Sequence, residues 1–176
     1  TAIGKPCPSP NASRRYSNSP ESATDGPVTA QIFPDFSDLL RALSANNANY
    51  IVVGAHALAA HGVIRATKDM DIWVRPSAEN ATRVIEALKQ YGAPMQGLTV
   101  EDLSAPGITF QLGLPPVRID ILTEIDGVDF ESAWKRRVET RFGDIPAPLL
   151  SIAHLIQHKR STRRLRDLAD VEELEK

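Results

Sequence analysis

The chain has 176 residues, of which 42% are hydrophobic and 24% are charged, so it can form one ordinary domain with a packed core. A formal net charge of -2 excludes a general nucleic-acid binder, and any anion site must come from a local cluster of Lys and Arg. The lone Cys7 excludes an internal disulfide, and no apolar run suits a membrane span or a secretory signal, so we expect a cytoplasmic protein with no membrane partner.

Residues 1–32 differ in composition from the rest of the chain. They are rich in Pro, Ser, Asn, Ala and Thr and have almost no apolar periodicity. Such a segment buries too little apolar surface to offset its conformational entropy. We therefore expect a disordered or linker-like tail, followed by a folded core over residues 33–150 and a C-terminal helical segment over residues 151–176.

Helices and strands alternate in the first half of the expected core. A helix beginning at Pro34 is predicted by apolar residues spaced i, i+3, i+4 and i+7, namely Phe36, Leu39, Leu40 and Leu43. The patterns that follow predict a strand over 50–53, a helix over 55–61, a strand over 68–75 and a helix between Ser77 and Gly92.

The second half predicts two consecutive strands and then mainly helices. Residues 93–106 fit no single element. The elements expected after them are strands over 108–112 and 117–122, a helix over 129–137, a small hairpin around Gly143 and Asp144, a helix capped by Ser151 and a last helix over 163–175. This order predicts an α/β (α+β) fold with a mixed sheet, helices mainly on one face and C-terminal helices packed on the core.

Three aspartates are the strongest candidates for chemistry. Asp69 and Asp71 are two positions apart on the predicted strand 68–75, so their side chains point to the same side with Cα atoms roughly 7 Å apart. Asp120 points the same way from another apolar strand. Neighbouring carboxylates repel unless a cation lies between them, and Mg²⁺ prefers oxygen ligands. The three carboxylates permit a two-ion site for phosphoryl transfer, and the alternative is ordinary solvent-facing strand residues.

A family signature is visible in residues 50–57 (YIVVGAHA) and, after a spacer, in residues 69–72 (DMDI). It resembles the nucleotidyltransferase superfamily that includes DNA polymerase beta, in which a hydrophobic residue, Gly and then Gly or Ser precede two acidic residues around an apolar one. The runs 61–71 and 158–171 are similar to a bacterial and archaeal subgroup of small nucleotidyltransferases, some of them in toxin–antitoxin and abortive-infection systems. The resemblance covers residues 48–176.

The resemblance implies a nucleotidyltransferase fold and an Mg²⁺-dependent reaction, with Mn²⁺ as a substitute ion. A nucleoside monophosphate would pass from ATP or another NTP to a hydroxyl of an unknown acceptor (RNA, protein or small molecule), with release of pyrophosphate. Asp69 and Asp71 would hold the metal ions, and Asp120 would be the third carboxylate, near the nucleophile. Gly54 would let the backbone approach the triphosphate, and Ala55, in the position of the family's second Gly or Ser, offers only its backbone N–H.

Basic residues supply further nucleotide-binding candidates. Arg65 and Lys68 precede the acidic strand and could neutralise phosphates, or they are solvated loop charges. A second basic cluster comprises Lys159, Arg160, Arg163, Arg164 and Arg166. Within it Lys159 is the preferred phosphate contact, because the family resemblance falls on it. The alternative is pairing along a helix, of Arg163 with Asp167 and of Arg166 with Asp170.

Two functional hypotheses remain open at the level of sequence. The first is the nucleotidyltransferase, and the second is a non-catalytic nucleotidyltransferase-like protein that acts as a regulatory or toxin–antitoxin partner of another protein. His154 and His158 have the i,i+4 spacing of zinc ligands, but surface histidines are the alternative interpretation. No P-loop, dinucleotide-binding motif or nucleophile elbow is present, which disfavours the common ATPases, dehydrogenases and serine hydrolases.

Overall fold

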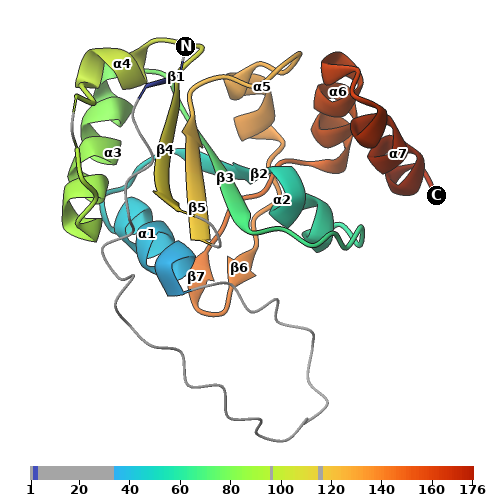
Figure 1. Cartoon of the computed structure of the whole chain (residues 1–176), viewed down its shortest axis with the longest axis horizontal. Coiled ribbons are helices and arrows are strands. Elements are labelled where there is room, and N and C mark those ends of the chain that lie inside the picture. The colour runs from blue at the N-terminus through green and yellow to red at the C-terminus, as the bar shows by residue number, and fades with distance from the viewer. Residues whose placement is uncertain (1, 4–33, 96, 115–116) are drawn as a thin grey trace, which may run out of the picture.

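The computed structural model describes residues 2–3, 34–95, 97–114 and 117–176 of the chain. Its centre is a mixed sheet whose four main strands have the order β4-β5-β3-β2 (Figure 1). These strands are β2 (Tyr50–Val53), β3 (Asp69–Val74), β4 (Thr109–Leu114) and β5 (Val117–Leu122). β3 and β5 are parallel, whereas β2 pairs antiparallel with β3 and β4 pairs antiparallel with β5. The mixed α/β architecture predicted from the sequence is confirmed.

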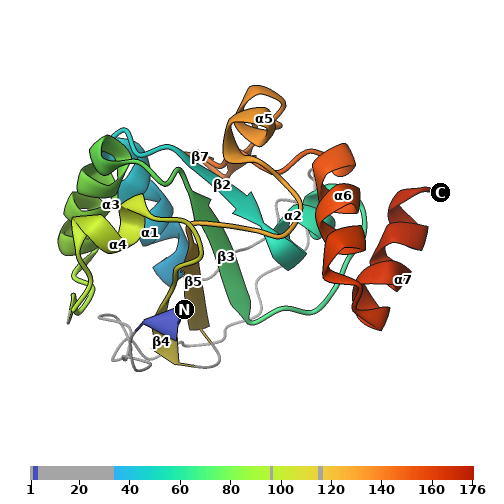
Figure 2. The ribbon, with the colours of Figure 1, turned by 90° about the horizontal axis from the view of Figure 1, so that it is seen from above.

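Helices flank this sheet on both sides. Figure 2 shows three of them gathered on one side, namely α1 (Pro34–Ala45), α3 (Ala78–Tyr91) and α4 (Val100–Ser104). Three others stand on the opposite side, namely α2 (Gly54–Ala60), α6 (Ile152–Thr162) and α7 (Leu165–Leu174). The helices are therefore less confined to one face of the sheet than the sequence predicts. The strand face that carries the aspartates borders a cleft beneath α6 and α7.

The hydrophobic core lies between the sheet and the first group of helices. All four apolar residues predicted for the first helix are fully buried in α1, and Met70 and Ile72 of β3 belong to the same cluster of buried apolar residues. α3 begins at the predicted cap, where the Ser77 hydroxyl accepts a hydrogen bond from the Asn80 N–H, and it ends at Gly92 with φ 85°. Local sequence signals and tertiary burial therefore agree in this half of the molecule.

The remaining elements connect the sheet to the C-terminal helices. They are α5 (Phe130–Lys135), which packs Phe130 edge-on against Trp73 with the ring centroids 4.9 Å apart, and the hairpin of β6 (Arg141–Phe142) and β7 (Ile145–Pro146). The hairpin predicted around Gly143 is confirmed. α4 falls within residues 93–106, whose pattern fits no single element, and it begins with a capping box of Thr99 and Asp102.

Two expectations concern the ends of the chain and the membrane. The tail predicted over residues 1–32 lies outside the described residues, apart from Ala2–Ile3, which form the short strand β1 beside β4. No helix within the described ranges is both long enough and apolar enough to cross a membrane.

Candidate functional site

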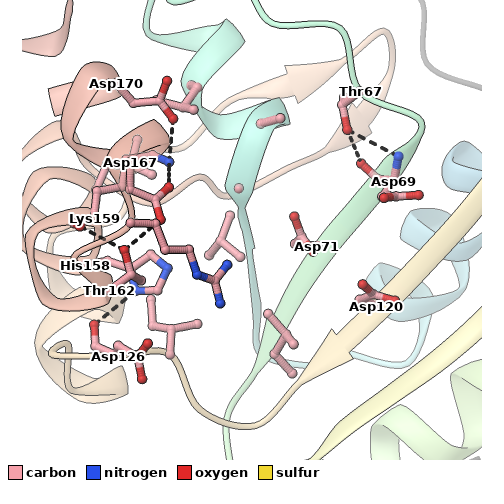
Figure 3. Close-up of a pocket in the computed structure, with 18 of the residues that line it drawn as sticks. Thr67, Asp69, Asp71, Asp120, Asp126, His158, Lys159, Thr162, Asp167 and Asp170 are labelled. Atoms are coloured by element: carbon pink, nitrogen blue, oxygen red, sulfur yellow. Dashed lines mark hydrogen bonds and ion pairs between the residues drawn. The ribbon is translucent and has the colours of Figure 1, made fainter. Parts of the chain in front are cut away.

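A cleft of about 630 Å³ separates β3 and β5 from the C-terminal helices. Figure 3 shows Asp69, Asp71 and Asp120 on the sheet side, facing Lys159 and Asp167 of α6 and α7 across this space. Its charged and imidazole lining residues are Arg65, Asp69, Asp71, Arg118, Asp120, Glu124, Asp126, His158, Lys159, Arg164, Arg166, Asp167 and Asp170. The cleft therefore brings residues more than 90 positions apart in the sequence, such as Asp69 and Asp167, into one polar site.

The three aspartates share one face because of strand register. Asp71 of β3 lies directly opposite Asp120 of β5 in the parallel pairing, and Asp69 comes two residues earlier on the same strand. The Thr67 hydroxyl fixes the start of β3 by accepting a hydrogen bond from the Asp69 N–H at 3.2 Å and donating one to the Asp69 carbonyl at 2.9 Å. The sequence predicted this shared face, and the structure brings the three residues together.

Arg118 partly neutralises this carboxylate group. Its guanidinium Nη2 donates to Asp69 Oδ2 at 2.8 Å and lies 3.4 Å from Asp120 Oδ2. The Gln111 amide donates to the other oxygen of Asp120 at 3.0 Å. Sequence reasoning missed both residues, although their positions carried a signal. Arg118 is two residues before Asp120 on the same strand, and Gln111 is its cross-strand partner on β4.

Asp71 is the least compensated of the three carboxylates. Burial, together with the negative charges of Asp120 and Asp69, raises its pKa from 3.8 to about 6, against the opposing influence of Arg118 and Lys159. A carboxyl whose ionised form is disfavoured by like charges is stabilised by any cation that joins the group. The site therefore has an electrostatic reason to bind a cation beside Asp71.

Gly54 sets the close approach of the backbone to Asp71. It begins α2 with φ 64°, and a Cβ at this position would lie 2.1 Å from Asp71 Oδ2. Only glycine meets both the positive φ and the lack of space. The neighbouring Ala55 also lines the cleft, so the turn from β2 into α2 forms its floor beside the acidic group.

The donor set fits a hard divalent cation in its chemistry. Asp69, Asp71 and Asp120 offer only carboxylate oxygens, which are the ligands that Mg²⁺ and Mn²⁺ accept. With the side chains in their present positions, the described ranges contain no group of three His, Cys, Asp or Glu residues arranged to hold an ion. Two of the three candidate ligands instead share the Arg118 guanidinium.

The predicted basic residues take different positions. Lys159 is buried, and its ammonium donates to Asp167 Oδ1 and to Asp170 Oδ2, each at 2.7 Å. Arg65 lines the cleft and pairs through Nε with the same Asp170. Lys68 has an exposed side chain and is not among the lining residues. The structure therefore brings Arg65 and Lys159 to the cleft as members of one ion-pair network and leaves Lys68 outside.

Asp167 and Asp170 of α7 were predicted only as partners of arginines on their own helix. The structure pairs them with Lys159 and Arg65 instead, because the chain reverses at Arg163, where φ is 54°. Burial alone would raise the pKa of Asp167, but the hydrogen bonds from Lys159 and Thr162 outweigh it and lower that pKa. This network fastens α7 to α6 and to the loop before β3.

The two candidate zinc-binding histidines have separate surroundings. His154 is buried, with Nδ1 3.0 Å from the Ser151 hydroxyl and Nε2 3.4 Å from that of Ser132, so it is not a surface residue. His158 places Nδ1 3.0 Å from the Asp126 carbonyl oxygen at the rim of the cleft. The two rings therefore contact different groups of the protein.

No protein-family model matches the chain, and a search of curated proteins finds no match either.

Proposed function

We propose that this chain is an Mg²⁺-dependent nucleotidyltransferase that transfers a nucleoside monophosphate from an NTP to a hydroxyl acceptor and releases pyrophosphate. The observation that carries the proposal is the shared face of Asp69, Asp71 and Asp120 beside Gly54, at the floor of a cleft of about 630 Å³. A cleft of this size suits a nucleotide. The sequence resemblance to the nucleotidyltransferase superfamily falls on the same residues.

The aspartates would divide the work by position. Asp69 and Asp71 would hold the cation, which supplies charge neutralisation of the phosphates and orientation of the α-phosphate. Asp120, on the neighbouring strand, would face the acceptor hydroxyl and accept its proton as the hydroxyl oxygen forms a bond to the α-phosphorus. The bond from that phosphorus to the bridging oxygen breaks, and pyrophosphate leaves with the bonding electrons.

Arg118 has a defined part in this scheme. Its ion pairs with Asp69 and Asp120 keep two carboxylates oriented while no cation is bound. Cation binding then requires Asp69 to exchange a guanidinium partner for a metal partner. Gln111 continues to orient Asp120 throughout, since it bonds the other carboxylate oxygen.

A second candidate function is a non-catalytic, nucleotide-binding partner protein. Two observations favour it specifically. Ala55 provides no hydroxyl toward the cleft, and Arg118 occupies oxygens of two of the three carboxylates. Such a protein would bind a nucleotide in the same cleft and release no pyrophosphate.

The test is a transfer assay with α-³²P-labelled forms of each of the four NTPs, in Mg²⁺ or Mn²⁺, with a cell extract as the acceptor source. We expect label in one macromolecular or small-molecule product, and no label with a variant carrying both Asp69→Asn and Asp71→Asn. Equal labelling by the double variant would refute the proposed catalytic role. Tight NTP binding without any transfer would support the non-catalytic partner instead.

A further inference from the structure

Most charges of the cleft are neutralised by one another in two groups. On the sheet side, Arg118 pairs with Asp69 and Asp120. On the helix side, Lys159 and Arg65 pair with two aspartates of α7. Two of the three basic residues that the sequence assigned to phosphate binding, Arg65 and Lys159, therefore already have carboxylate partners.

Two arginines of the lining lie outside both groups. Arg164 and Arg166 flank the start of α7, both are exposed and both line the cleft. The guanidinium group of neither arginine makes a hydrogen bond or an ion pair with another described residue. Arg164 lies near enough to Asp167 to lower the pKa of that carboxyl, but the oxygens of Asp167 are taken by Lys159 and Thr162.

The opposite wall of the cleft, formed by the sheet, carries an excess of negative charge. Asp71 has no ion pair among the described residues, and it lies directly opposite Asp120 and two residues from Asp69, so one arginine, Arg118, faces three carboxylates on this wall. A ligand that satisfies both walls needs a cation at one end and several anionic oxygens at the other. A metal-bound polyphosphate has this distribution of charge, and guanidinium groups bind phosphate oxygens with two parallel hydrogen bonds.

We propose that Arg164 and Arg166 form the phosphate-binding wall of the cleft and hold the terminal phosphates of the nucleotide. The inference rests on the proposed function for the identity of the nucleotide, but the binding of a polyphosphate can be tested by itself. The two arginines replace Arg65, Lys68 and Lys159 as the expected phosphate contacts. Lys159 instead positions α7 so that the two arginines face the sheet.

The experiment measures binding by calorimetry with three probes, Mg²⁺ plus inorganic tripolyphosphate, Mg²⁺ plus ATP, and a single-stranded RNA oligonucleotide. The variants are Arg164→Gln, Arg166→Gln and their combination. Arg163→Gln is the matched control, because it removes the same charge from the neighbouring residue, which lines a separate hollow on the outer surface of α6.

We expect each cleft variant to weaken tripolyphosphate and ATP binding about tenfold and the double variant about a hundredfold, as is typical for hydrogen bonds to charged groups. Arg163→Gln should leave both affinities within about twofold, the size of a small surface effect. Tripolyphosphate binding that is absent from the wild type, or equal in the double variant and the control, would overturn the proposal. So would a loss confined to the RNA probe, which would assign the arginines to an acceptor.

These outcomes are independent of turnover. If the arginine variants bind tripolyphosphate less tightly but the wild type never releases pyrophosphate, the phosphate-binding wall is supported and the transferase activity is refuted. If the wild type releases pyrophosphate but the arginine variants bind tripolyphosphate as tightly as the wild type, the transferase activity is supported and the phosphate-binding wall is refuted.

Discussion

At the scale of single residues, the contact between Gly54 and Asp71 makes a prediction with an internal control. Gly54→Ala places a methyl group against the Asp71 carboxylate and also strains a positive φ. Gly62→Ala, at the other end of α2, strains a positive φ with no atom within 4 Å. We expect both variants to lose about 1 kcal/mol of stability from the backbone, and only Gly54→Ala to lose more and to lose activity.

Thermal unfolding and pyrophosphate release would measure the two effects. Equal behaviour of the two variants in both assays would show that the close approach of Gly54 to Asp71 has no functional role.

Asp71 makes a second prediction, on stability against pH. Its folded pKa of about 6 lies above the unfolded value of 3.8, so the folded protein holds the proton more tightly. Ionisation of Asp71 therefore lowers the free energy of unfolding of the metal-free protein. The loss is complete above about pH 6 and absent below about pH 4. Asp71→Asn removes this cost. We expect it to raise the free energy of unfolding at pH 7.5 by about 1 to 3 kcal/mol and the melting temperature by a few degrees.

The same comparison at pH 4 should show little difference between Asp71→Asn and the wild type. Asp126→Asn, at the exposed rim of the cleft, is the control and should shift neither melting curve. A wild-type protein more stable than Asp71→Asn at pH 7.5 without metal would contradict the electrostatic account of the site.

At the scale of elements, the packing of α2 predicts acid sensitivity. His56 lies edge-on to Phe36 of α1 and Phe142 of β6, and burial lowers its pKa. The unfolded chain therefore binds a proton at His56 more readily than the folded chain does. The free energy of unfolding is unaffected by this group above the unfolded pKa of 6.5, and it falls as the pH decreases below that value. We expect His56→Phe to flatten the loss of stability between pH 7 and pH 5, as followed by urea unfolding. A loss unchanged in that variant would assign the acid sensitivity to other groups.

The junction of α6 and α7 makes a contrasting prediction for two neighbouring cations. Lys159→Met leaves Asp167 and Asp170 without their ammonium partner in a buried site, and we expect a loss of about 3 kcal/mol or more. Arg160→Met breaks only the exposed pair with Glu175 and should cost less than about 1 kcal/mol. Urea unfolding of both variants checks the difference. A small effect of Lys159→Met would show that the network does not hold α7 in place.

The sequence predicted the elements more completely than their charge pairing. The alternation in β3 was enough to place Asp69 and Asp71 on one face, because strand geometry is local. The position of Asp120 opposite Asp71 depends on β3 and β5 being parallel neighbours, which the expected order of elements allowed but did not require. The partners of Asp167 and Asp170 lie outside α7, on α6 and in the loop before β3, so the i,i+4 pairing that was the alternative interpretation of the arginines does not form.

At the scale of the whole molecule, the fold joins two parts with different stabilising forces. The sheet and the helices α1 and α3 share a continuous hydrophobic core. α7 instead contributes only Val171 as a buried apolar residue and leaves Leu165 largely exposed. Its attachment through buried ion pairs places the charged cleft at the boundary between the two parts. The site thus lies where polar side chains, rather than apolar packing, determine the arrangement.

The most direct test of the proposed function is pyrophosphate release by the wild type, by Asp71→Asn and by Asp126→Asn, with Mg²⁺, NTP and a cell extract. The account predicts release by the wild type, a similar rate for Asp126→Asn, and a rate at least about a hundredfold lower for Asp71→Asn, as when an electrostatic group of a transition state is lost. Circular dichroism would establish that Asp71→Asn is folded. Release by folded Asp71→Asn at the wild-type rate would contradict the account.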